Sequence, residues 1–267
     1  MFRFNFIHKL GSYVYSFFEY IGKLSIFSFQ VFKNFFSKPF YLKEFIMSLE
    51  EVGYRSLGII FTISFFSGMI MTLNVGKIMD SIVKGTSQYV GAGILLVMIK
   101  EFGPVLTSIS LISRVGAGIT AQLSTMKATE QIDALKVMSI SPVKFLVVPK
   151  VLAIVTMIPF LASISVISGV LGGLVMAVLY LDQSYLTYFD KVLFALKKQD
   201  IFDMILKSLI LGFFIGTVSC FYGMESEGGA RGVGIYTTRS VVASFIIIVI
   251  IDYIVTFVLI SIRSLFF

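Results

Sequence analysis

The chain has 267 residues, of which 57% are hydrophobic and 14% charged, and its mean hydropathy is +0.94. A soluble globule of this size cannot hide so much apolar surface, so the composition excludes an ordinary soluble protein and predicts an all-α integral membrane protein. The formal charge of +7 would suit nucleic-acid binding on a soluble chain. On an apolar chain, basic residues set topology and contact anionic headgroups, so we expect no nucleic-acid partner.

Residues 1–50 predict an amphipathic interfacial region rather than a membrane span. Charged residues interrupt them, and no charge-free run reaches the roughly 20 residues of a crossing. Apolar side chains recur every three or four positions, the period of a helix lying flat in the interface. They are Phe6, Leu10, Tyr13, Phe17, Ile21 and Leu24. A soluble amphipathic helix packed on a partner protein is the alternative, and Lys38-Pro39 punctuates the region.

Charge-poor runs predict five transmembrane helices, at about 56–76, 90–113, 151–181, 201–224 and 241–262. The third run has 31 residues without a charge, so its helix must tilt, kink at Pro159 or extend beyond the bilayer. With the amino terminus in the cytosol, the inner segments carry fourteen Lys and Arg residues and the outer loops, including Lys84, carry six. The positive-inside rule therefore favours a cytosolic amino terminus and a cytosolic segment at 115–150.

Asp203 lies near the entry of the fourth predicted span, and four other charged side chains within the spans are candidates for embedded charges: Lys100, Glu101, Lys207 and Asp252. An ionised side chain at mid-bilayer costs about 2.5–3.5 kcal/mol on insertion scales, so such residues are normally buried in the bundle and functional. Two interpretations stay open. The charges either pair to hold helices together, or line a cavity that accepts a charged headgroup or couples to gating. The Gly-Pro pair at 103–104 predicts a kinked, locally opened helix beside Glu101, because proline removes a backbone donor.

A short polar helix is expected at about 129–139, with Pro142 closing it. Thr129 is expected to cap this helix, with Glu130 near the positive end of its dipole and Lys136 toward the negative end.

Apolar residues of the same helix, Ile132, Leu135 and Met138, would form a stripe that enters a groove on a partner. Packing of this stripe on the chain's own loops is the alternative.

The glycine-rich segment 228–234 invites a phosphate-binding interpretation, but it lacks the Lys and Ser or Thr of a P-loop. We expect a tight cytoplasmic turn there. No P-loop motif occurs elsewhere in the sequence, so an ATP-driven role needs a separate ATPase chain. Small residues at four-residue spacing predict close helix packing, at Gly212 and Gly216 and at Ser165, Gly169 and Gly173.

Several segments in order resemble the MlaE permease family, also called YrbE. They are E-F-G-P-V-L at 101–106, R-V-G-A-G-I at 114–119, T-E-Q-I-D-A-L-K-V-M at 129–138, S-P-V-K-F-L-V-V-P-K-V-L-A at 141–153, G-G-A-R-G-V-G at 228–234 and T-T-R-S-V-V-A-S at 237–244. The resemblance implies the membrane subunit of an Mce-associated ABC transporter that moves phospholipids. It implies a five-helix permease domain at 51–267, after the interfacial region at 1–50.

The resemblance also implies partners and residue roles. The permease would act as a homodimer with cytoplasmic ABC ATPases and an Mce-domain lipid-binding protein. The coupling helix would present Thr129, Glu130, Gln131, Ile132, Asp133, Leu135 and Lys136. Charges in or near the bundle would be Lys100, Glu101, Lys207, Arg239 and Asp252. Gln122 and Ser124 depart from the family, which often has Glu and Gly there, so no carboxylate role is expected at that turn.

The function expected from the sequence is therefore transport of phospholipid or a related polar lipid, with no covalent chemistry, metal or cofactor on this chain and ATP used by the partner. Phe61, Phe65, Phe66 and Met69 would line an acyl-chain cavity at the dimer interface. The alternative is an ATPase-independent, proton- or ion-coupled membrane protein that uses Glu101 and Asp252. Expected locations are the bacterial inner membrane or, given the Phe-, Ile- and Lys-rich composition, a plastid inner envelope.

Overall fold

A computed structural model of the chain describes residues 2–35, 37, 41–82 and 86–266, and the side chains of 15, 18–35, 37, 41–79, 81 and 86–264. Lys38, Pro39 and Lys84 lie outside the described residues, as do the side chains of Phe6, Leu10, Tyr13 and Phe17. The described residues are helical and contain no strand, which confirms the all-α class. A chain that crosses lipid as helices satisfies its backbone hydrogen bonds within each segment.

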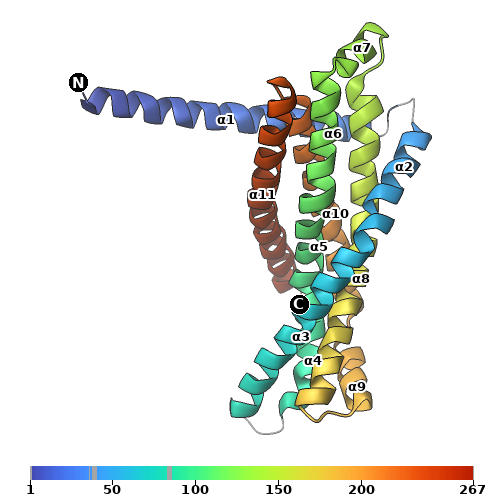
Figure 1. Ribbon diagram of the computed structural model, residues 1–267. Coiled ribbons are helices and arrows are strands. Elements are labelled where there is room, and N and C mark those ends of the chain that lie inside the picture. Colours follow the sequence, from blue (N-terminus) through green and yellow to red (C-terminus); the bar gives the residue numbers. More distant parts are fainter. Residues whose placement is uncertain (1, 36, 38–40, 83–85, 267) are drawn as a thin grey trace.

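The helices follow one another with short connections (Figure 1). They are α1 (Phe2–Asn34), α2 (Leu42–Val52), α3 (Leu57–Ile82), α4 (Val90–Val97), α5 (Gly103–Leu111), α6 (Ala117–Ala128), α7 (Gln131–Val137), α8 (Val148–Tyr180), α9 (Tyr185–Ala195), α10 (Lys198–Met224) and α11 (Gly229–Phe266). Short turns join some of them: η1 (Tyr54–Ser56), η2 (Thr86–Tyr89), η3 (Met98–Phe102), η4 (Ile112–Gly116) and η5 (Val143–Val147).

Five helical stretches of the described residues are long and apolar enough to cross a membrane, as the sequence predicts. They are Leu42–Met79, Thr86–Ala128, Val143–Tyr180, Lys198–Met224 and Gly229–Ser264. Each is longer than its predicted span, because helices continue past the charged residues that end the apolar runs. The second stretch, for example, runs through Arg114 to Ala128 as α4, α5 and α6, joined by the π-helical turns η3 and η4.

Helix α8 lies at the centre of the packing, and small residues let α3 cross it closely. A Cβ added at Gly68 would collide with the carbonyl oxygen of Gly169, and one at Gly172 with that of Phe65. On the other side of α8, added Cβ atoms at Gly212 and Gly216 of α10 would approach the α8 backbone at Val155 and Val151 within 3.3 and 3.1 Å. The predicted close packing is confirmed.

Two buried apolar clusters hold the two ends of the bundle. The larger lies between α8, α10 and the α5–α6 stretch and reaches Ile132 of α7. The smaller joins α4, α8 and α9 at the opposite end. Helix α9 is not among the predicted elements, because its run is too short to span a bilayer. Its Tyr188 is fully buried and donates a hydrogen bond to the carbonyl oxygen of Val170 at 3.0 Å.

Helix α1 projects sideways from the α7 end of the bundle, at a steep angle to the spanning helices (Figure 1). Aromatic rings fasten its second half to α10. Tyr20 and Phe27 meet Phe221 with ring centroids 5.4 and 5.6 Å apart, and Phe35 meets Phe213 at 5.9 Å. Such edge-to-face contacts fix the position of this part of α1 on the bundle.

The glycine-rich segment 228–234 is not the predicted turn, because α11 already begins at Gly229. The turn lies just before it and ends with two left-handed residues, Gly228 at φ +89° and Gly229 at φ +61°. A Cβ at Gly232 would collide with the carbonyl oxygen of Glu227. Most of these glycines therefore serve a tight entry into a helix, and the sequence prediction of a glycine-rich turn was wrong for 229–234.

Candidate functional site

The embedded charges predicted from the sequence meet between three helical segments. Lys100 and Glu101 lie in the π-helical turn η3, directly before the Gly-Pro pair that starts α5. A π-helical turn widens the helix, which agrees with the local opening predicted there, and such turns are frequent at functional sites. Lys207 comes from α10 and Asp252 from α11. Residues more than 150 positions apart thus share one site.

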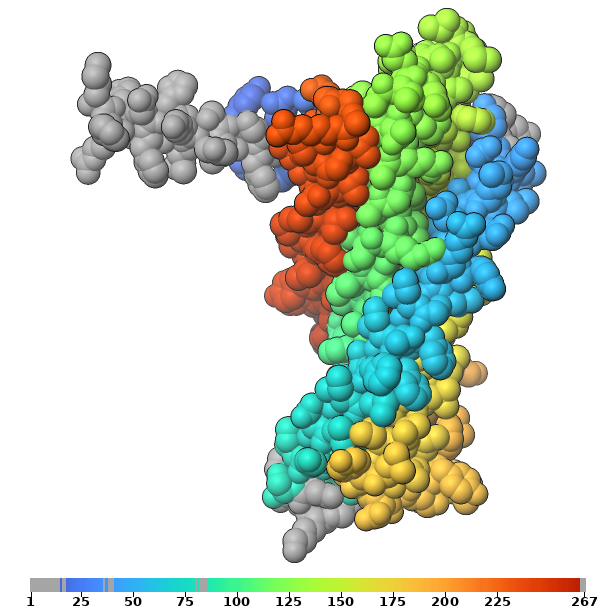
Figure 2. Space-filling model, viewed as in Figure 1, coloured from blue at the N-terminus to red at the C-terminus, as the bar shows by residue number. Residues whose placement is uncertain are grey.

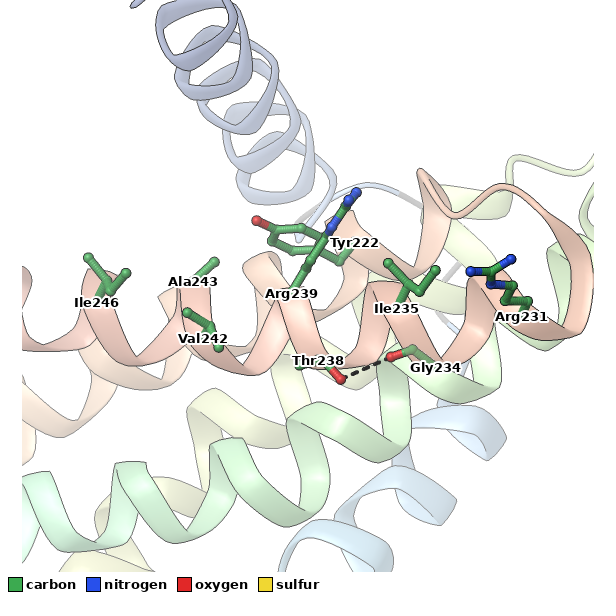
Figure 3. A pocket seen from close by; sticks show the side chains of 9 residues that line it. All are labelled: Tyr222, Arg231, Gly234, Ile235, Thr238, Arg239, Val242, Ala243 and Ile246. Carbon is green, nitrogen blue, oxygen red and sulfur yellow. Dashed lines mark hydrogen bonds between the residues drawn. The ribbon is translucent and has the colours of Figure 1, made fainter. Parts of the chain in front are cut away.

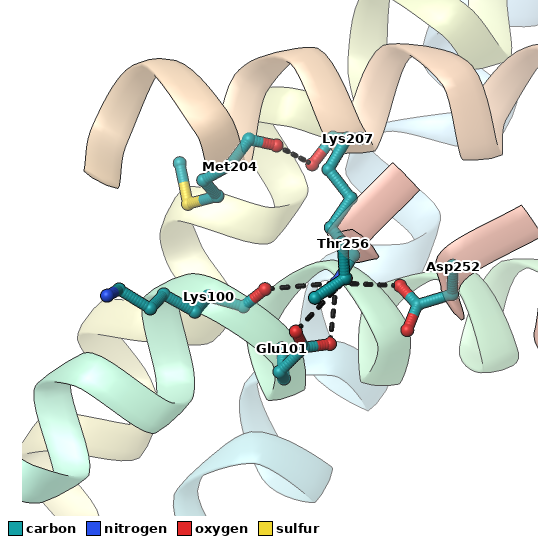
Figure 4. Close-up of polar contacts among 7 residues, drawn as sticks. Lys100, Glu101, Met204, Lys207, Asp252 and Thr256 are labelled. Atoms are coloured by element: carbon teal, nitrogen blue, oxygen red, sulfur yellow. Dashed lines mark hydrogen bonds and ion pairs between the residues drawn. The ribbon is translucent and has the colours of Figure 1, made fainter. Parts of the chain in front are cut away.

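Lys207 is the centre of this cluster, and its side chain is only 2% exposed. Its Nζ lies 2.5 Å from Oε2 of Glu101 and 2.9 Å from Oδ1 of Asp252 (Figure 4). It also donates to the backbone oxygen of Lys100 at 3.1 Å and to Oγ1 of Thr256 at 2.8 Å. Thr256 in turn donates to Oε1 of Glu101 at 3.1 Å. One ammonium group is therefore surrounded by acceptors from three helices, as a buried cation requires.

A second group of charges adjoins the first, nearer the ends of α10 and α11. Its centre is Asp200, which is 1% exposed. Oδ1 of Asp200 lies 3.6 Å from Nζ of Lys100 and 3.3 Å from one guanidinium nitrogen of Arg263. The other terminal nitrogen of Arg263 lies 2.5 Å from Oδ2 of Asp203. Lys100 thus contributes its backbone to Lys207 and its side chain to Asp200. The pairs tie the start of α10 to the end of α11.

Thr256, Asp200 and Arg263 are site residues that the sequence analysis missed. A threonine is common in an apolar membrane helix. Asp200 and Arg263 lie at the ends of apolar runs, where charged residues are usual. The signal was the spacing: positions 252, 256 and 263 lie on one face of a helix at i, i+4 and i+11.

A cavity of about 120 Å³ opens beside the cluster. Its lining combines charged and apolar side chains: Lys100, Glu101, Asp203, Lys207, Thr256, Leu259, Ile260 and Arg263. Three cations and two carboxylates around one small space can hold a charged group without leaving it unpaired. Within the described residues, no group of three or more His, Cys, Asp or Glu side chains is placed to hold a metal ion.

Arg239, predicted to belong with the buried charges, lies elsewhere. It is exposed near the start of α11, 13 residues before Asp252, which is about 20 Å along a helix. There it lines a groove of about 860 Å³ together with Tyr222 of α10 and other residues of α11 (Figure 3). The resemblance placed Arg239 in or near the bundle, and the structure shows it near the bundle end, apart from Glu101 and Asp252.

Two of the three residues in the apolar stripe of the predicted coupling helix face the chain itself. Ile132 of α7 is 2% exposed, and Leu135 packs against the same core. Packing on its own chain, the alternative left open by the sequence, therefore holds for both. On the outer side, Val137 is 86% exposed, and Met138, the third residue of the predicted stripe, is 68% exposed directly after α7.

The expected cap of this helix is also absent. Thr129 lies before α7 and donates its hydroxyl to the carbonyl oxygen of Thr125 at 2.9 Å, so it extends α6. Glu130 takes the position before α7 in a left-handed conformation, φ 59°. Asp133 and Lys136 form an ion pair of 2.7 Å on the exposed face beside Gln131. The hydrogen bond from Lys136 holds the pKa of Asp133 below its ordinary value.

The phenylalanines predicted to line a lipid cavity lie on α3. Phe61 and Phe66 are 46% and 56% exposed. Phe65 and Met69 are partly buried beside them, and the rings of Phe61 and Phe65 stack with centroids 5.9 Å apart. In a single chain these four residues therefore border an open apolar surface. Figure 2 shows the outline of the molecule indented between the end of α11 and the diverging lower part of α3.

Comparison with known proteins gives consistent matches along most of the chain. The family model described as "Permease MlaE" matches residues 45–258. The "Probable ABC transporter permease protein RP096" of Rickettsia prowazekii is 34% identical over 249 residues, which cover 93% of this chain and 95% of the relative. Proteins with the same description, slr1045 of Synechocystis and ycf63 of Pyropia yezoensis, are 34% and 32% identical over 77% of this chain, and the matches cover 77% and 78% of their own lengths.

Proposed function

The chain belongs to the MlaE permease family and is an ABC transporter permease; from this premise we propose that it moves a phospholipid or a related polar lipid between membranes. The observation that supports this cargo is the combination of exposed apolar helix faces with a small charged cavity at the same site. Only 11% of the residues in the most apolar part of α11 are buried, although that helix carries Asp252 and Thr256 of the cluster. A two-part surface of this kind suits an amphiphile.

The acyl chains occupy the indentation between α3 and α11. Two copies of the chain, related by a two-fold axis with the carboxyl-terminal halves of their α11 helices facing one another, would close this indentation into a chamber. Phe61, Phe65, Phe66 and Met69 then line its wall. The proposed homodimer explains why so much apolar surface of α11 is left open in the single chain. A two-fold axis brings the same surface of both copies together, so that each covers the other.

The charged cluster binds the lipid headgroup or controls the opening of the transporter. Lys100 and Arg263 are partly exposed beside the 120 Å³ cavity, and their partner Asp200 is buried. A lipid phosphate reaching this cavity competes with the carboxylates for these cations. Such competition loosens the ties between η3, α10 and α11, and so couples the cargo to a movement of the helices.

Energy comes from a partner. The sequence has no P-loop, so an ABC ATPase binds ATP and docks on the α7 end, with α7 as the coupling helix. An Mce-domain lipid-binding protein meets the opposite end, where α9 lies. Helix α1 lies in the membrane interface at the cytoplasmic face, in keeping with its sideways projection and basic, aromatic composition. The bacterial inner membrane or a plastid inner envelope is the expected location, since relatives come from bacteria and from red algae.

Lipid retention tests this function. We expect Phe66→Glu to abolish co-purification of phospholipid with the permease, because a carboxylate in the chamber wall repels acyl chains. Phe160→Glu is the matched control, since Phe160 is 68% exposed on α8 and outside the proposed chamber. Mass spectrometry of extracted lipids is the measurement. Equal phospholipid content in wild type and Phe66→Glu would contradict the proposal.

The ion-coupled alternative makes a different forecast. It requires activity in proteoliposomes without any ATPase, and a proton flux that is lost in Asp252→Asn. Family membership favours ATP-driven transport, which predicts that lipid moves only when the ATPase and ATP are both present.

A further inference from the structure

Another cavity lies away from the charge cluster, at the start of α11 (Figure 3). It has a volume of about 860 Å³ and is here called the arginine groove. Its lining is Tyr222, Arg231, Gly234, Ile235, Thr238, Arg239, Val242, Ala243 and Ile246. Apart from Tyr222, all of these belong to one helix. The groove plays no part in the chamber proposed above.

Polarity changes along the arginine groove in one direction. Arg231, Ile235 and Arg239 recur at four-residue spacing and point to the same side of α11 (Figure 3). After Arg239 the lining is apolar up to Ile246, which is 56% exposed. Two cations followed by two turns of apolar helix match a phosphate followed by an acyl chain.

Both arginines are free to receive an anion. In the part of the chain that the structure describes, neither Arg231 nor Arg239 has a carboxylate at ion-pairing distance. The guanidinium of Arg239 lies over the ring of Tyr236, 5.5 Å from its centroid, which orients the side chain. A guanidinium binds phosphate oxygens in pairs, so an oriented arginine is a good phosphate ligand.

A second, polar pocket of about 330 Å³ adjoins the arginine groove and shares Tyr222 and Arg239 with it. It contains three carboxylates. Glu19 of α1 pairs with Lys23 at 2.8 Å. Glu225 and Glu227, in the turn before α11, have no ion-pair partner among the described side chains. Glu225 and Glu227 therefore share this pocket with Arg239, and with Lys23 on its α1 side.

We propose that the arginine groove and the adjoining pocket bind a glycerophospholipid with an amine-bearing headgroup, of the phosphatidylethanolamine kind. The phosphate binds Arg231 and Arg239, the ammonium group binds Glu225 and Glu227, and one acyl chain lies along Val242, Ala243 and Ile246. Phosphatidylglycerol offers no cation to the two glutamates. Phosphatidylcholine offers a cation without N–H donors. The site thus selects a headgroup by pairing both of its charges.

Native mass spectrometry tests the site without relying on transport. The purified permease is incubated with equal amounts of phosphatidylethanolamine, phosphatidylglycerol and phosphatidylcholine in mixed micelles, and retained lipid is counted. We expect wild type to retain mainly phosphatidylethanolamine. The variant with Arg231→Gln and Arg239→Gln should retain at least about tenfold less, since each arginine contributes charge-assisted hydrogen bonds. The matched control, Lys127→Gln with Lys144→Gln, removes two cations at the same end of the bundle and should retain lipid normally.

A second variant tests the headgroup separately. Glu225→Gln with Glu227→Gln should keep total lipid binding but lose the preference for phosphatidylethanolamine over phosphatidylglycerol. The proposal is overturned if wild type shows no such preference, or if the arginine variant retains as much lipid as wild type. The proposal is also overturned if Val242→Cys forms a disulfide between two copies and the amount of cross-linked dimer stays the same when lipid is added. A second copy then fills the groove. Loss of lipid from the chamber variant Phe66→Glu alone leaves this proposal standing.

Discussion

At the scale of single residues, the candidate site depends on Lys207. Its ammonium group lies between two carboxylates, of Glu101 and Asp252, and is almost completely shielded from solvent. A buried charge is tolerated only when its partners compensate the loss of hydration. If Lys207 is removed, the two carboxylates face each other without a cation. The cluster therefore acts as one unit.

We expect Lys207→Met to lower the free energy of unfolding by about 3–5 kcal/mol, the usual cost of breaking a buried ion pair. Thermal denaturation of the detergent-solubilised protein measures this. The triple variant Glu101→Gln, Lys207→Met and Asp252→Asn removes all three charges and should regain most of the stability. If the triple variant also transports lipid at the normal rate, the cluster is only structural and its proposed role at the headgroup or in gating is wrong.

The charged residues of the site could be predicted from the sequence because charges are rare within apolar membrane spans, where their burial is costly. Lys100, Glu101, Lys207 and Asp252 stand out because apolar residues surround them in the sequence. Their pairing was not predictable, because it depends on how α10 and α11 rotate about their axes. Arg239 was grouped with them by the family resemblance alone, although it precedes the predicted span at 241–262 and lies 13 residues before Asp252.

At the scale of elements, α7 presents one side to its own chain and the other outward. The inner side holds Ile132, which belongs to the large core cluster. The outer side holds Val137 and Met138, which are exposed. A short helix that is fixed to the core on one side can transmit a push received on the other. Contacts with an ATPase should therefore concentrate on the outer side.

Substitutions on the two sides of α7 should have opposite consequences. We expect Val137→Asp to reduce co-purification of the ABC ATPase about tenfold, while the amount of folded permease stays normal. Ile132→Asp should instead reduce the folded permease itself, since it buries an unpaired carboxylate. Size-exclusion chromatography and quantification of both chains distinguish the two. ATPase binding that survives Val137→Asp undiminished would rule out this surface as the docking site.

The crossing of α3 and α8 gives a second prediction for an element. We expect Gly172→Ala to destabilise the permease by about 1–3 kcal/mol, because the new Cβ meets the backbone oxygen of Phe65, which cannot move aside alone. Gly118→Ala on α6 is the control: nothing lies within 4 Å of its added Cβ, so it should be neutral or slightly stabilising. Chemical or thermal denaturation compares the pair. Equal stability of both variants would contradict the close crossing.

Element types followed from the sequence more reliably than element faces. Long apolar runs predicted the five spans, because lipid demands a helix of a certain length. The proline at 104 also indicated the opened turn η3. The sequence left open which way the apolar stripe of α7 faces, because seven residues offer too few turns to fix a periodicity. Helix α11 begins earlier than predicted, because its glycines permit a tight entry. Local sequence did not contain the packing that decides these points.

At the scale of the whole molecule, the two ends of the bundle differ in what they offer. The α7 end carries the exposed side of α7, the arginine groove and the side-projecting α1. The opposite end carries α9, whose Phe194 is 88% exposed. The proposed transporter requires the α7 end to face the ATPase in the cytosol and the α9 end to face the partner that exchanges lipid.

Cysteine labelling with a membrane-impermeant maleimide tests this orientation most directly. Val137→Cys places a thiol at the α7 end and Phe194→Cys one at the α9 end, with side chains of nearly equal exposure, 86% and 88%. The native Cys220 is fully buried and should stay unlabelled. With the outer membrane made permeable and the inner membrane intact, we expect Phe194→Cys to react at once and Val137→Cys only after the inner membrane is opened. Reaction of Val137→Cys while that membrane is sealed would contradict the whole account.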